Sequence, residues 1–215
     1  MKISWDKFFT MCIFGLPGSG KTNLLRYIVF SGAKNKQFDH CLLFSATKDT
    51  DDYNFLDPKY KYDAYNEDVI EKYMDICQKA NEKEIKTRGL IIFDDICGSQ
   101  TFKSPLFNRL FSNYRHAGIS VILCQQMLVE LPLKIRSIIK YYIIYKYVGE
   151  ADREKIFNCI GSLTKNKKEF YEIYEKYTNE KYKALFYSFT DVYETDTSAY
   201  SGIRAPMVKP FKLSF

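Results

Sequence analysis

A chain of 215 residues with 46% hydrophobic and 17% aromatic residues is long enough to bury one substantial core but short for two independent domains. The 32 Lys and Arg residues against 26 Asp and Glu residues give a formal charge of +6, which permits contact with a polyanion without demanding it. The sequence contains no run of 18 apolar residues and no signal-peptide layout at its start, which argues against a membrane-spanning or secreted chain. We therefore expect a soluble, intracellular protein without a membrane partner.

The hydrophobic pattern predicts strands and helices in alternation. Residues 8–14 predict a strand, and after a glycine-rich turn residues 22–30 carry apolar side chains at helical spacing. Further strands are expected at 41–45, 90–94, 120–125 and 141–147, and further helices at 67–82, 105–115 and 133–139. Residues 49–65 form a polar and aromatic segment. The alternation indicates an α/β fold with a mostly parallel central sheet covered by helices.

The pattern changes beyond Gly149. Helices are expected at 151–160 and 168–177 and a strand at 184–189, followed by a tail that contains Gly202, Pro206 and Pro210. We interpret residues 1–148 as the core, and residues 149–215 as a small α/β appendage and tail of the same domain. The six cysteines lack paired spacing, which favours unpaired thiols over disulfides or a zinc site.

The turn after the first strand carries a complete G-x-x-x-x-G-K-[ST] motif, made by Gly15, Leu16, Pro17, Gly18, Ser19, Gly20, Lys21 and Thr22. Its backbone N–H groups can surround a β-phosphate at the start of a helix, and Lys21 can bridge the β- and γ-phosphates. The Thr22 hydroxyl can bind Mg²⁺. The alternative, a chance glycine-rich turn before a helix, does not account for the correct flanking elements. The motif therefore predicts binding of ATP with Mg²⁺.

The strand at 90–94 ends in two carboxylates, Asp94 and Asp95. Asp94 is expected to hold Mg²⁺ through water beside the phosphate loop. Asp95 is expected to face the γ-phosphate as the base that activates the attacking water, although solvated acids at a strand end are the alternative. Residues 95–98 also fit the D-x-x-G pattern of GTPases, but the nearest match to a guanine-reading motif, at 166–169, lies in a charged helical stretch. Guanine specificity is therefore not expected.

The strand at 120–125 ends in Gln125, which can hydrogen-bond both the attacking water and the γ-phosphate, whereas Gln126 is expected to point away. An amide that caps exposed backbone is the alternative reading of Gln125. Arg115 is the candidate for a finger that neutralises the γ-phosphate of a neighbouring subunit, and Arg109 is the second candidate. An arginine that stabilises a helix carboxyl end is an equally good explanation of Arg115.

With these elements in this order, residues 8–148 resemble the FtsK-HerA superfamily, and within it the poxvirus-like genome-packaging ATPases of large DNA viruses and virophages. The resemblance implies a RecA-like (ASCE) P-loop ATPase core with an added strand between the two Walker strands. It also implies a homo-oligomeric ring, a pentamer or hexamer, that pulls double-stranded DNA into a preformed capsid, with capsid or vertex proteins as partners. The location would then be the host cytoplasm, a viral factory or the virion. Asp95 departs from the Glu of cellular relatives.

A DNA motor needs basic groups along its channel, and phosphate contacts suffice because packaging ignores sequence. The candidates are Lys134, Arg136, Lys140, Lys165, Lys167 and Lys168, with solvated surface charge as the alternative for each. Two other functions remain open: a helicase or conjugation-type DNA pump, and a nucleotide-gated capsid assembly factor. Asp95 and Gln125 argue against the assembly factor, because a binding switch has little need of a base and a γ-phosphate sensor.

Overall fold

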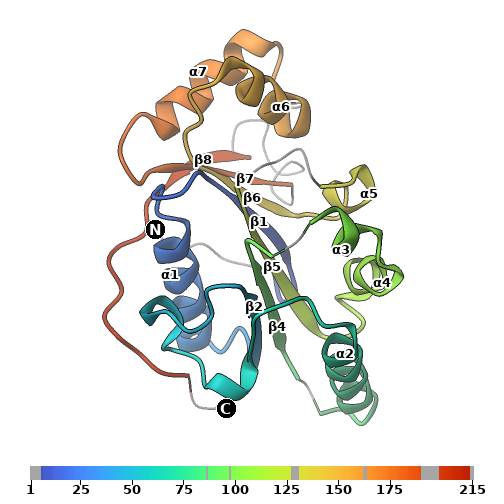
Figure 1. Ribbon diagram of the computed structural model, residues 1–215. Helices are drawn as coiled ribbons and strands as arrows, with labels where there is room; N and C mark the ends of the chain where they lie inside the picture. The colour runs from blue at the N-terminus through green and yellow to red at the C-terminus, as the bar shows by residue number, and fades with distance from the viewer. Residues whose placement is uncertain are drawn as a thin grey trace.

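The computed structural model describes residues 6–85, 87–96, 98–126, 131–161, 164–189 and 199–213. Its centre is an eight-stranded sheet with the strand order β3-β2-β4-β5-β1-β6-β7-β8 (Figure 1). Strands β1 to β6 run parallel, and β7 and β8 are antiparallel to their neighbours. The strands are β1 Thr10–Phe14, β2 His40–Ser45, β3 Lys61–Tyr62, β4 Gly89–Asp94, β5 Ile119–Gln125, β6 Tyr141–Ile144, β7 Ala184–Ser188 and β8 Tyr200–Ile203. The predicted α/β class with a mostly parallel sheet is confirmed.

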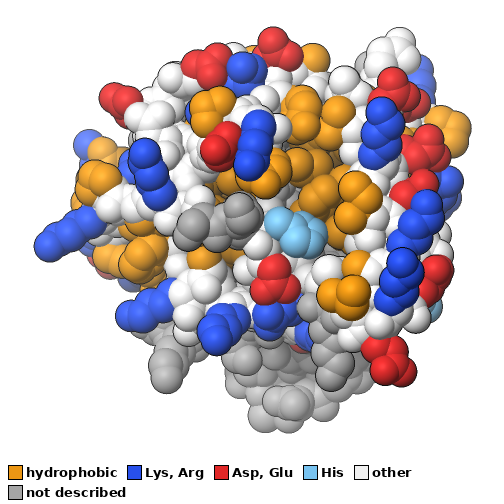
Figure 2. All heavy atoms as spheres, turned by 90° about the horizontal axis from the view of Figure 1, so that it is seen from below, with side chains coloured by type: hydrophobic (Ala, Val, Ile, Leu, Met, Phe, Trp, Pro, Cys, Tyr) orange, Lys and Arg blue, Asp and Glu red, His pale blue; other side chains and the backbone are white. Residues whose placement is uncertain are grey.

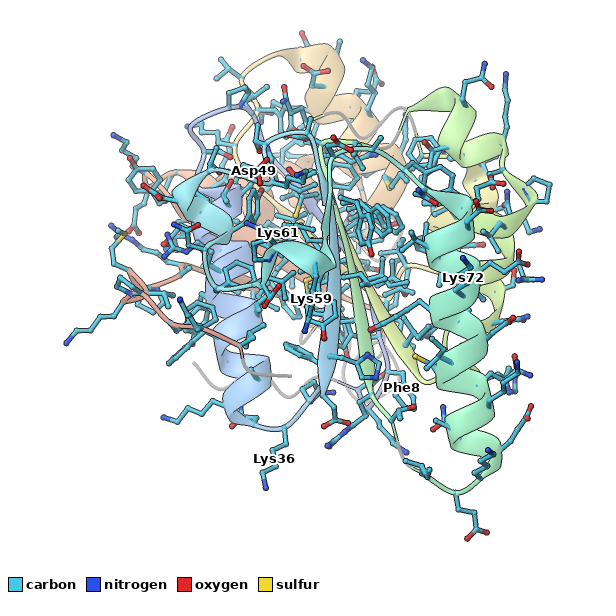
Figure 3. All side chains as sticks on the ribbon, turned by 60° about the horizontal axis from the view of Figure 1, so that its bottom comes forward. Phe8, Lys36, Asp49, Lys59, Lys61 and Lys72 are labelled. Carbon is cyan, nitrogen blue, oxygen red and sulfur yellow. The ribbon has the colours of Figure 1, made fainter. Side chains whose placement is uncertain are left out.

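Helices cover both faces of the sheet. Figure 3 shows Lys59 and Lys61 in front of the sheet edge, with α1 on one side and α2, which carries Lys72, on the other. The helices are α1 Lys21–Lys34, α2 Glu67–Glu82, α3 Ser99–Lys103, α4 Pro105–Asn113, α5 Leu133–Arg136, α6 Glu150–Ile160 and α7 Lys167–Thr178, with 3₁₀ turns η1 Asp51–Tyr53 and η2 Pro58–Tyr60. Helix α1 packs on one face, and α2, α4, α5, α6 and α7 contribute to the core on the other.

The central strands are apolar throughout because both of their faces are buried. In β4, Ile91 and Phe93 pack toward α2 and α4, whereas Leu90 and Ile92 pack toward α1. Alternate side chains of a strand point to opposite faces, so a strand between two helical layers has to be hydrophobic at every position. This is why the continuous apolar runs in the sequence mark the centre of the sheet.

The order of the central strands brings several chain segments to one edge. Strand β5 pairs with β1 on one side and with β4 on the other, as the resemblance implied for an added strand between the two Walker strands. In the register of these pairs, Phe14 lies opposite Gln125, and Asp94 lies opposite Cys124. The carboxyl ends of β1, β4 and β5 therefore lie side by side, where parallel sheets bind their ligands.

The structure corrects the sequence prediction at several elements. Residues 200–203, assigned to the tail, form strand β8, and α3 was not predicted at all. The helices expected at 105–115 and 133–139 end at Asn113 and Arg136, and the strand expected at 141–147 ends at Ile144. Strand β8 contains Gly202 and gains its strand conformation by pairing with β7, which local sequence does not reveal.

Strand β6 pairs with β7 across the boundary that we predicted at residue 148, so residues on both sides of it share one sheet. The division into a core at 1–148 and an appendage at 149–215 stays a prediction about domain organisation. Among the described cysteines, Cys41, Cys77, Cys124 and Cys159 carry free thiols, and Cys97 lies outside the described residues. In the part of the chain that is described, none of the helices has the length and apolar character to cross a membrane.

Candidate functional site

The phosphate loop connects β1 to α1 and leaves an open concave backbone. Gly20 has a φ of +102° directly before the helix, a conformation that residues with a Cβ rarely adopt. At Gly15 an added Cβ would lie 2.4 Å from Ser19 Oγ and 2.9 Å from the Tyr145 ring, so a larger residue there would displace both side chains. The Gly15 N–H donates to the Gln125 carbonyl over 3.2 Å, which ties the loop to the end of β5. The predicted motif thus occupies the predicted strand–loop–helix context.

Lys21 is held in the loop, where a phosphate chain is expected to lie. Its side chain is 7% exposed, and Nζ donates to the Gly15 carbonyl over 2.6 Å. Nζ also lies 3.7 Å from Asp95 Oδ2. Thr22 follows in the first turn of α1 and is partly exposed. The structure therefore brings Lys21 and Asp95 together at the amino end of a helix, whose dipole favours bound anions.

Asp94 is buried at the end of β4, with 6% of the residue exposed. Its Oδ2 accepts a hydrogen bond from the hydroxyl of Tyr53, which is itself buried. No described N–H or O–H group donates to Oδ1, although this oxygen is buried. Burial raises the pKa of Asp94, and the hydrogen bond from Tyr53 and the charge of Lys21 oppose this rise.

Asp95 lies one residue further, and its backbone turns sharply there. Its φ is +50°, in the left-handed region that few residues other than glycine, Asn and Asp adopt. The N–H of Asp95 donates to the Cys124 carbonyl over 3.0 Å, and its carboxylate is 38% exposed. The turn thus gives the two acids opposite surroundings, with Asp94 buried and Asp95 open to solvent beside Lys21.

Two glutamines lie at the carboxyl end of β5, beside these acids: Gln125 is the last residue of the strand, and Gln126 follows it. Gln125 is 4% exposed and lies opposite Phe14, the last residue before the phosphate loop. We had expected Gln126 to point away from the site, and this prediction is wrong. Its Nε2 donates to Asp95 Oδ2 over 3.1 Å, because the left-handed turn at Asp95 directs that carboxylate toward the end of β5. Both amides therefore lie at the edge of the sheet that carries the acids.

The two candidate arginine fingers lie in α4 and directly after it. Arg115 precedes the amino end of β5, and the seven residues of β5 separate it from the site by roughly 20 Å, at about 3.3 Å per residue. It is exposed, and its Nε donates to the Tyr114 hydroxyl over 2.9 Å. Arg109 pairs with Glu71 over 2.8 Å. Arg115 therefore cannot reach the phosphate loop of its own subunit, and the Arg109 guanidinium is engaged by Glu71.

The surface at the amino ends of the strands has mixed charge. Figure 2 shows this face with Lys and Arg side chains spaced among acidic ones around an apolar centre. An example is the ion pair of Arg88, before β4, with Asp39, before β2, at 2.8 Å. The charge pattern of the described residues on this face does not mark them as a surface for DNA.

The basic residues predicted to contact DNA differ in their surroundings. Lys140 pairs with Asp6, and Lys167 pairs with Glu154 over 2.8 Å, so these two charges are balanced within the chain. Arg136 and Lys140 are partly buried. The exposed candidates for which the described residues supply no ion pair are Lys134, Lys165 and Lys168.

Buried polar atoms without a hydrogen-bond partner among the described residues indicate that the site fits a triphosphate and a divalent cation. Within the described chain, Ser19 Oγ and Asp94 Oδ1 are both buried without a hydrogen-bond partner. Buried polar atoms are rarely left unpaired, and carboxylate and hydroxyl oxygens are the ligands that Mg²⁺ prefers. Asp94 and Thr22 are the residues that could hold the metal, and the loop amides with Lys21 could hold the phosphates.

Several tyrosines at the site were not identified from the sequence. The Tyr145 hydroxyl donates to the Gly20 carbonyl over 3.2 Å, and the Tyr147 hydroxyl donates to the Gln126 carbonyl. Tyr174 in α7 links the two, because its hydroxyl donates to the Tyr145 carbonyl over 2.9 Å and accepts from the Tyr147 N–H over 2.8 Å. The sequence placed Tyr53 only within the polar and aromatic segment at 49–65, where it belonged to no motif. These tyrosine contacts are therefore revealed by the packing of the chain.

A comparison with known families matches residues 3–199 to the family described as Poxvirus A32 protein. Among curated proteins, the chain is 26% identical over 182 residues to uncharacterised protein 075L of Invertebrate iridescent virus 6, covering 81% of this chain and 68% of that protein. It is 20% identical over 181 residues to uncharacterised protein 015R of Frog virus 3, covering 82% of this chain and 55% of that protein. The chain thus spans little more than half the length of the second relative.

Solved structures share the fold at low identity. The genome packaging NTPase B204 from Sulfolobus turreted icosahedral virus 2 in complex with AMPPCP has a TM-score of 0.67 at 16% identity, covering 94% of this chain and 100% of that chain. The cytoplasmic domain of the Type VII secretion ATPase EccC from Thermomonospora curvata has a TM-score of 0.61 at 14% identity, covering 93% of this chain and 25% of that chain. The similarity to B204 extends over its whole length, including the region beyond residue 148.

Proposed function

This chain belongs to the Poxvirus A32 protein family and has the fold of the viral genome-packaging ATPases, and from this premise we propose that it is an ATP-driven motor that moves double-stranded DNA into a preformed capsid. The single observation that carries the proposal is the convergence of Lys21, Asp94 and Asp95 at one edge of that fold. A phosphate loop beside two acids in different surroundings is suited to hydrolysis and not merely to binding.

The residues take separate parts in hydrolysis. The loop amides and Lys21 bind and orient the phosphates. Water attacks the γ-phosphorus and Asp95 accepts a proton from this water, while the bond between the γ-phosphorus and the β–γ bridging oxygen breaks and ADP leaves. Gln125 orients this water through its amide. Asp94 and Thr22 are the residues that would hold Mg²⁺, which when bound neutralises charge on the phosphate oxygens. ATP is the expected nucleotide, because the sequence has no guanine-reading motif in a suitable place.

The partners follow from the proposed motor. A homo-oligomeric ring, a pentamer or hexamer, would bring Arg115 of one subunit to the phosphates of the next, since Arg115 cannot reach its own site. Double-stranded DNA would pass through the ring, with Lys134, Lys165 and Lys168 as the best-placed candidates for phosphate contact. Capsid or vertex proteins would anchor the ring, in a viral factory or elsewhere in the host cytoplasm, or in the virion.

Steady-state ATP hydrolysis tests the proposal directly. Turnover per subunit is expected to rise with protein concentration and to rise further, several-fold, with long double-stranded DNA, because the shared site forms only in the ring. Charge reversal at Lys134 is expected to reduce the stimulation by DNA and to leave basal turnover unchanged. Lys34→Glu, at an exposed residue in the last turn of α1, is the matched control.

Other results of the same assay would favour the alternatives. Separation of DNA strands would indicate a helicase. Tight ATP binding without turnover at any concentration would contradict the motor and favour a nucleotide-gated assembly factor.

The hydrogen bond from Tyr53 to Asp94 leads to a prediction about the metal. Tyr53→Phe keeps the buried ring and removes only the hydroxyl that orients the carboxylate. Loss of a group that orients a metal ligand typically costs 10- to 100-fold in metal affinity. We expect the Mg²⁺ concentration for half-maximal turnover to rise by about tenfold or more. Tyr62→Phe, on β3, is the control, and an unchanged Mg²⁺ requirement in Tyr53→Phe would show that Asp94 is oriented without Tyr53.

A further inference from the structure

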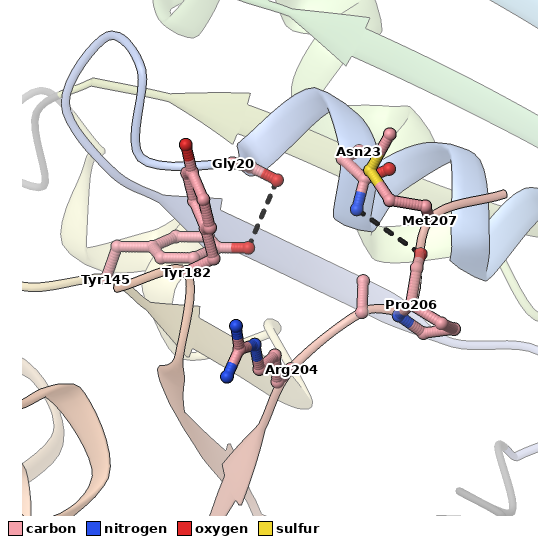
Figure 4. A pocket seen from close by; sticks show the side chains of 8 residues that line it. Gly20, Asn23, Tyr145, Tyr182, Arg204, Pro206 and Met207 are labelled. Carbon is pink, nitrogen blue, oxygen red and sulfur yellow. Dashed lines mark hydrogen bonds between the residues drawn. The ribbon is translucent and has the colours of Figure 1, made fainter. Parts of the chain in front are cut away.

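A cavity adjoins the phosphate loop on the side away from Asp94 and Asp95. It has a volume of about 570 Å³, within the range of small-molecule sites. Its lining comes from four separate parts of the chain: the start of α1, Tyr145 after β6, Tyr182 before β7, and residues 204–207 beyond β8 (Figure 4).

The order of the strands places this cavity where a nucleoside would project. Asp94 and Gln125 lie on β4 and β5, on one side of β1, whereas Tyr145 follows β6 on the other side. A triphosphate that presents its γ-phosphate to the acids therefore extends its opposite end toward Tyr145. Gly20 belongs both to the phosphate loop and to the cavity wall, so the two sites are continuous.

Two tyrosines line this cavity, and they differ in exposure: Tyr145 is buried, with 3% of the residue exposed, whereas Tyr182 is open to solvent. Tyr145 is fixed by its hydrogen bond to the Gly20 carbonyl. Tyr182 has a φ of +64°, and its ring lies 3.2 Å from the position that a Cβ of Gly20 would take. A tyrosine in the left-handed region is strained, and such strain is concentrated at ligand sites. Tyr182 is nonetheless 44% exposed, so its ring is available to a ligand.

Another wall of the cavity is formed by the C-terminal strap, which we define as residues 204–213. Asn23 Nδ2 donates to the Pro206 carbonyl over 3.4 Å, as Figure 4 shows. Further along, the Phe211 ring stacks on Phe55 with centroids 5.1 Å apart, and the Leu213 N–H donates to the Phe55 carbonyl over 2.7 Å. These contacts hold the strap at two points, on α1 and on the segment that follows η1.

Met207 lies in the strap between the two points of attachment. It is 85% exposed although it lines the cavity. An apolar side chain held in this way at the rim of an aromatic cavity is suited to cover a flat apolar ligand.

We propose that this cavity binds the base of the nucleotide and favours purines over pyrimidines, with Tyr182 as the stacking surface and Met207 as a cover. The inference rests on the proposed nucleotide-binding function and deepens it by naming the residues that select the base. A purine presents a larger ring surface for stacking than a pyrimidine does. The C-terminal strap thereby becomes a specificity-determining part of the ATPase site.

Equilibrium binding to the full chain, measured by calorimetry with Mg²⁺, tests the assignment with two ligands: ATP, and tripolyphosphate, which has no base. Tyr182→Ala is expected to weaken ATP binding about tenfold and to leave tripolyphosphate binding unchanged. Alanine keeps the Cβ, so the backbone strain at position 182 is retained. Tyr182→Phe, which keeps the ring, is expected to bind ATP as the wild type does, and Lys21→Ala is expected to weaken both ligands.

Two comparisons extend the test. The wild type is expected to bind ATP and GTP a few-fold more tightly than CTP and UTP, because the larger purine ring stacks better, and Tyr182→Ala is expected to reduce this ratio. Met207→Ala should weaken ATP several-fold, whereas Val148→Ala, which also alters an exposed apolar side chain, should not.

The outcomes separate the two levels of the argument. Equal weakening of ATP and tripolyphosphate by Tyr182→Ala, or no weakening of ATP, would overturn the base site and leave the phosphate site standing. Failure of tripolyphosphate and ATP to bind the wild type would overturn the nucleotide function together with the base site.

Discussion

Arg115→Ala is expected to lower ATP turnover of the assembled protein by about 10³-fold, the low end of the contribution of arginine fingers in related chemistry. Arg115 is exposed at the amino edge of the sheet, and the phosphate loop lies at the carboxyl edge of the same sheet. A head-to-tail ring can join these two edges of neighbouring subunits, so the arginine would act only between subunits. Nucleotide affinity should change much less, because the finger stabilises charge that develops in the transition state.

Mixing variants tests the action between subunits. Arg115→Ala and Lys21→Ala subunits are each expected to be inactive alone, and a mixture should recover activity at interfaces where a Lys21→Ala subunit presents its Arg115 to an intact phosphate loop. Arg109→Ala is the matched variant from the same region, and it should retain turnover because Arg109 is paired with Glu71. Full activity of Arg115→Ala, or lost activity in Arg109→Ala alone, would move the assignment to Arg109.

Asp95→Asn is expected to lower turnover by about 10²- to 10⁴-fold, the usual contribution of a general base, and to keep ATP affinity within a few-fold of the wild type. Asparagine tolerates the left-handed backbone at this position, so the turn at φ +50° can persist. The amide can still accept hydrogen bonds but cannot take the proton of the attacking water.

Single-turnover hydrolysis at saturating ATP, measured beside equilibrium ATP binding, separates the two effects. Asp75→Asn, on the exposed face of α2, provides the control for the charge change. A large loss of ATP affinity in Asp95→Asn would instead assign Asp95 to nucleotide binding, and unchanged turnover would mean that another group activates the water.

The local elements of this protein could be predicted because their signals are local. Helix α2 has the predicted bounds, because Asn66 Oδ1 accepts the Val69 N–H at 3.1 Å and caps the helix at its start. The phosphate loop was recognised from adjacent residues, because all the groups expected to bind the phosphates and Mg²⁺ lie within residues 15–22. Asp94 and Asp95 could be placed beside the loop because the carboxyl ends of parallel strands meet at one edge.

Contacts between distant segments were decided by the tertiary structure. Tyr53 meets Asp94 across 41 positions of sequence, and Asn23 meets Pro206 across 183. The turn at Asp95 brought Gln126 to its carboxylate against expectation, since a hydrogen-bond partner depends on backbone direction as well as on sequence position. Strand β8 formed where only a tail was predicted, because pairing with β7 outweighs a weak local preference.

The sequence by itself determined the chemistry of this protein, an ATPase site whose phosphate loop and acids are encoded in short contiguous segments with fixed geometry. Only the tertiary structure decided how the residues of this site are buried and which distant residues contact them. It buried Asp94 against Tyr53, left Asp95 exposed beside Lys21, and brought the C-terminal strap to the nucleotide site. Burial and long-range contact depend on how all the elements pack, and no short segment of the chain carries that information.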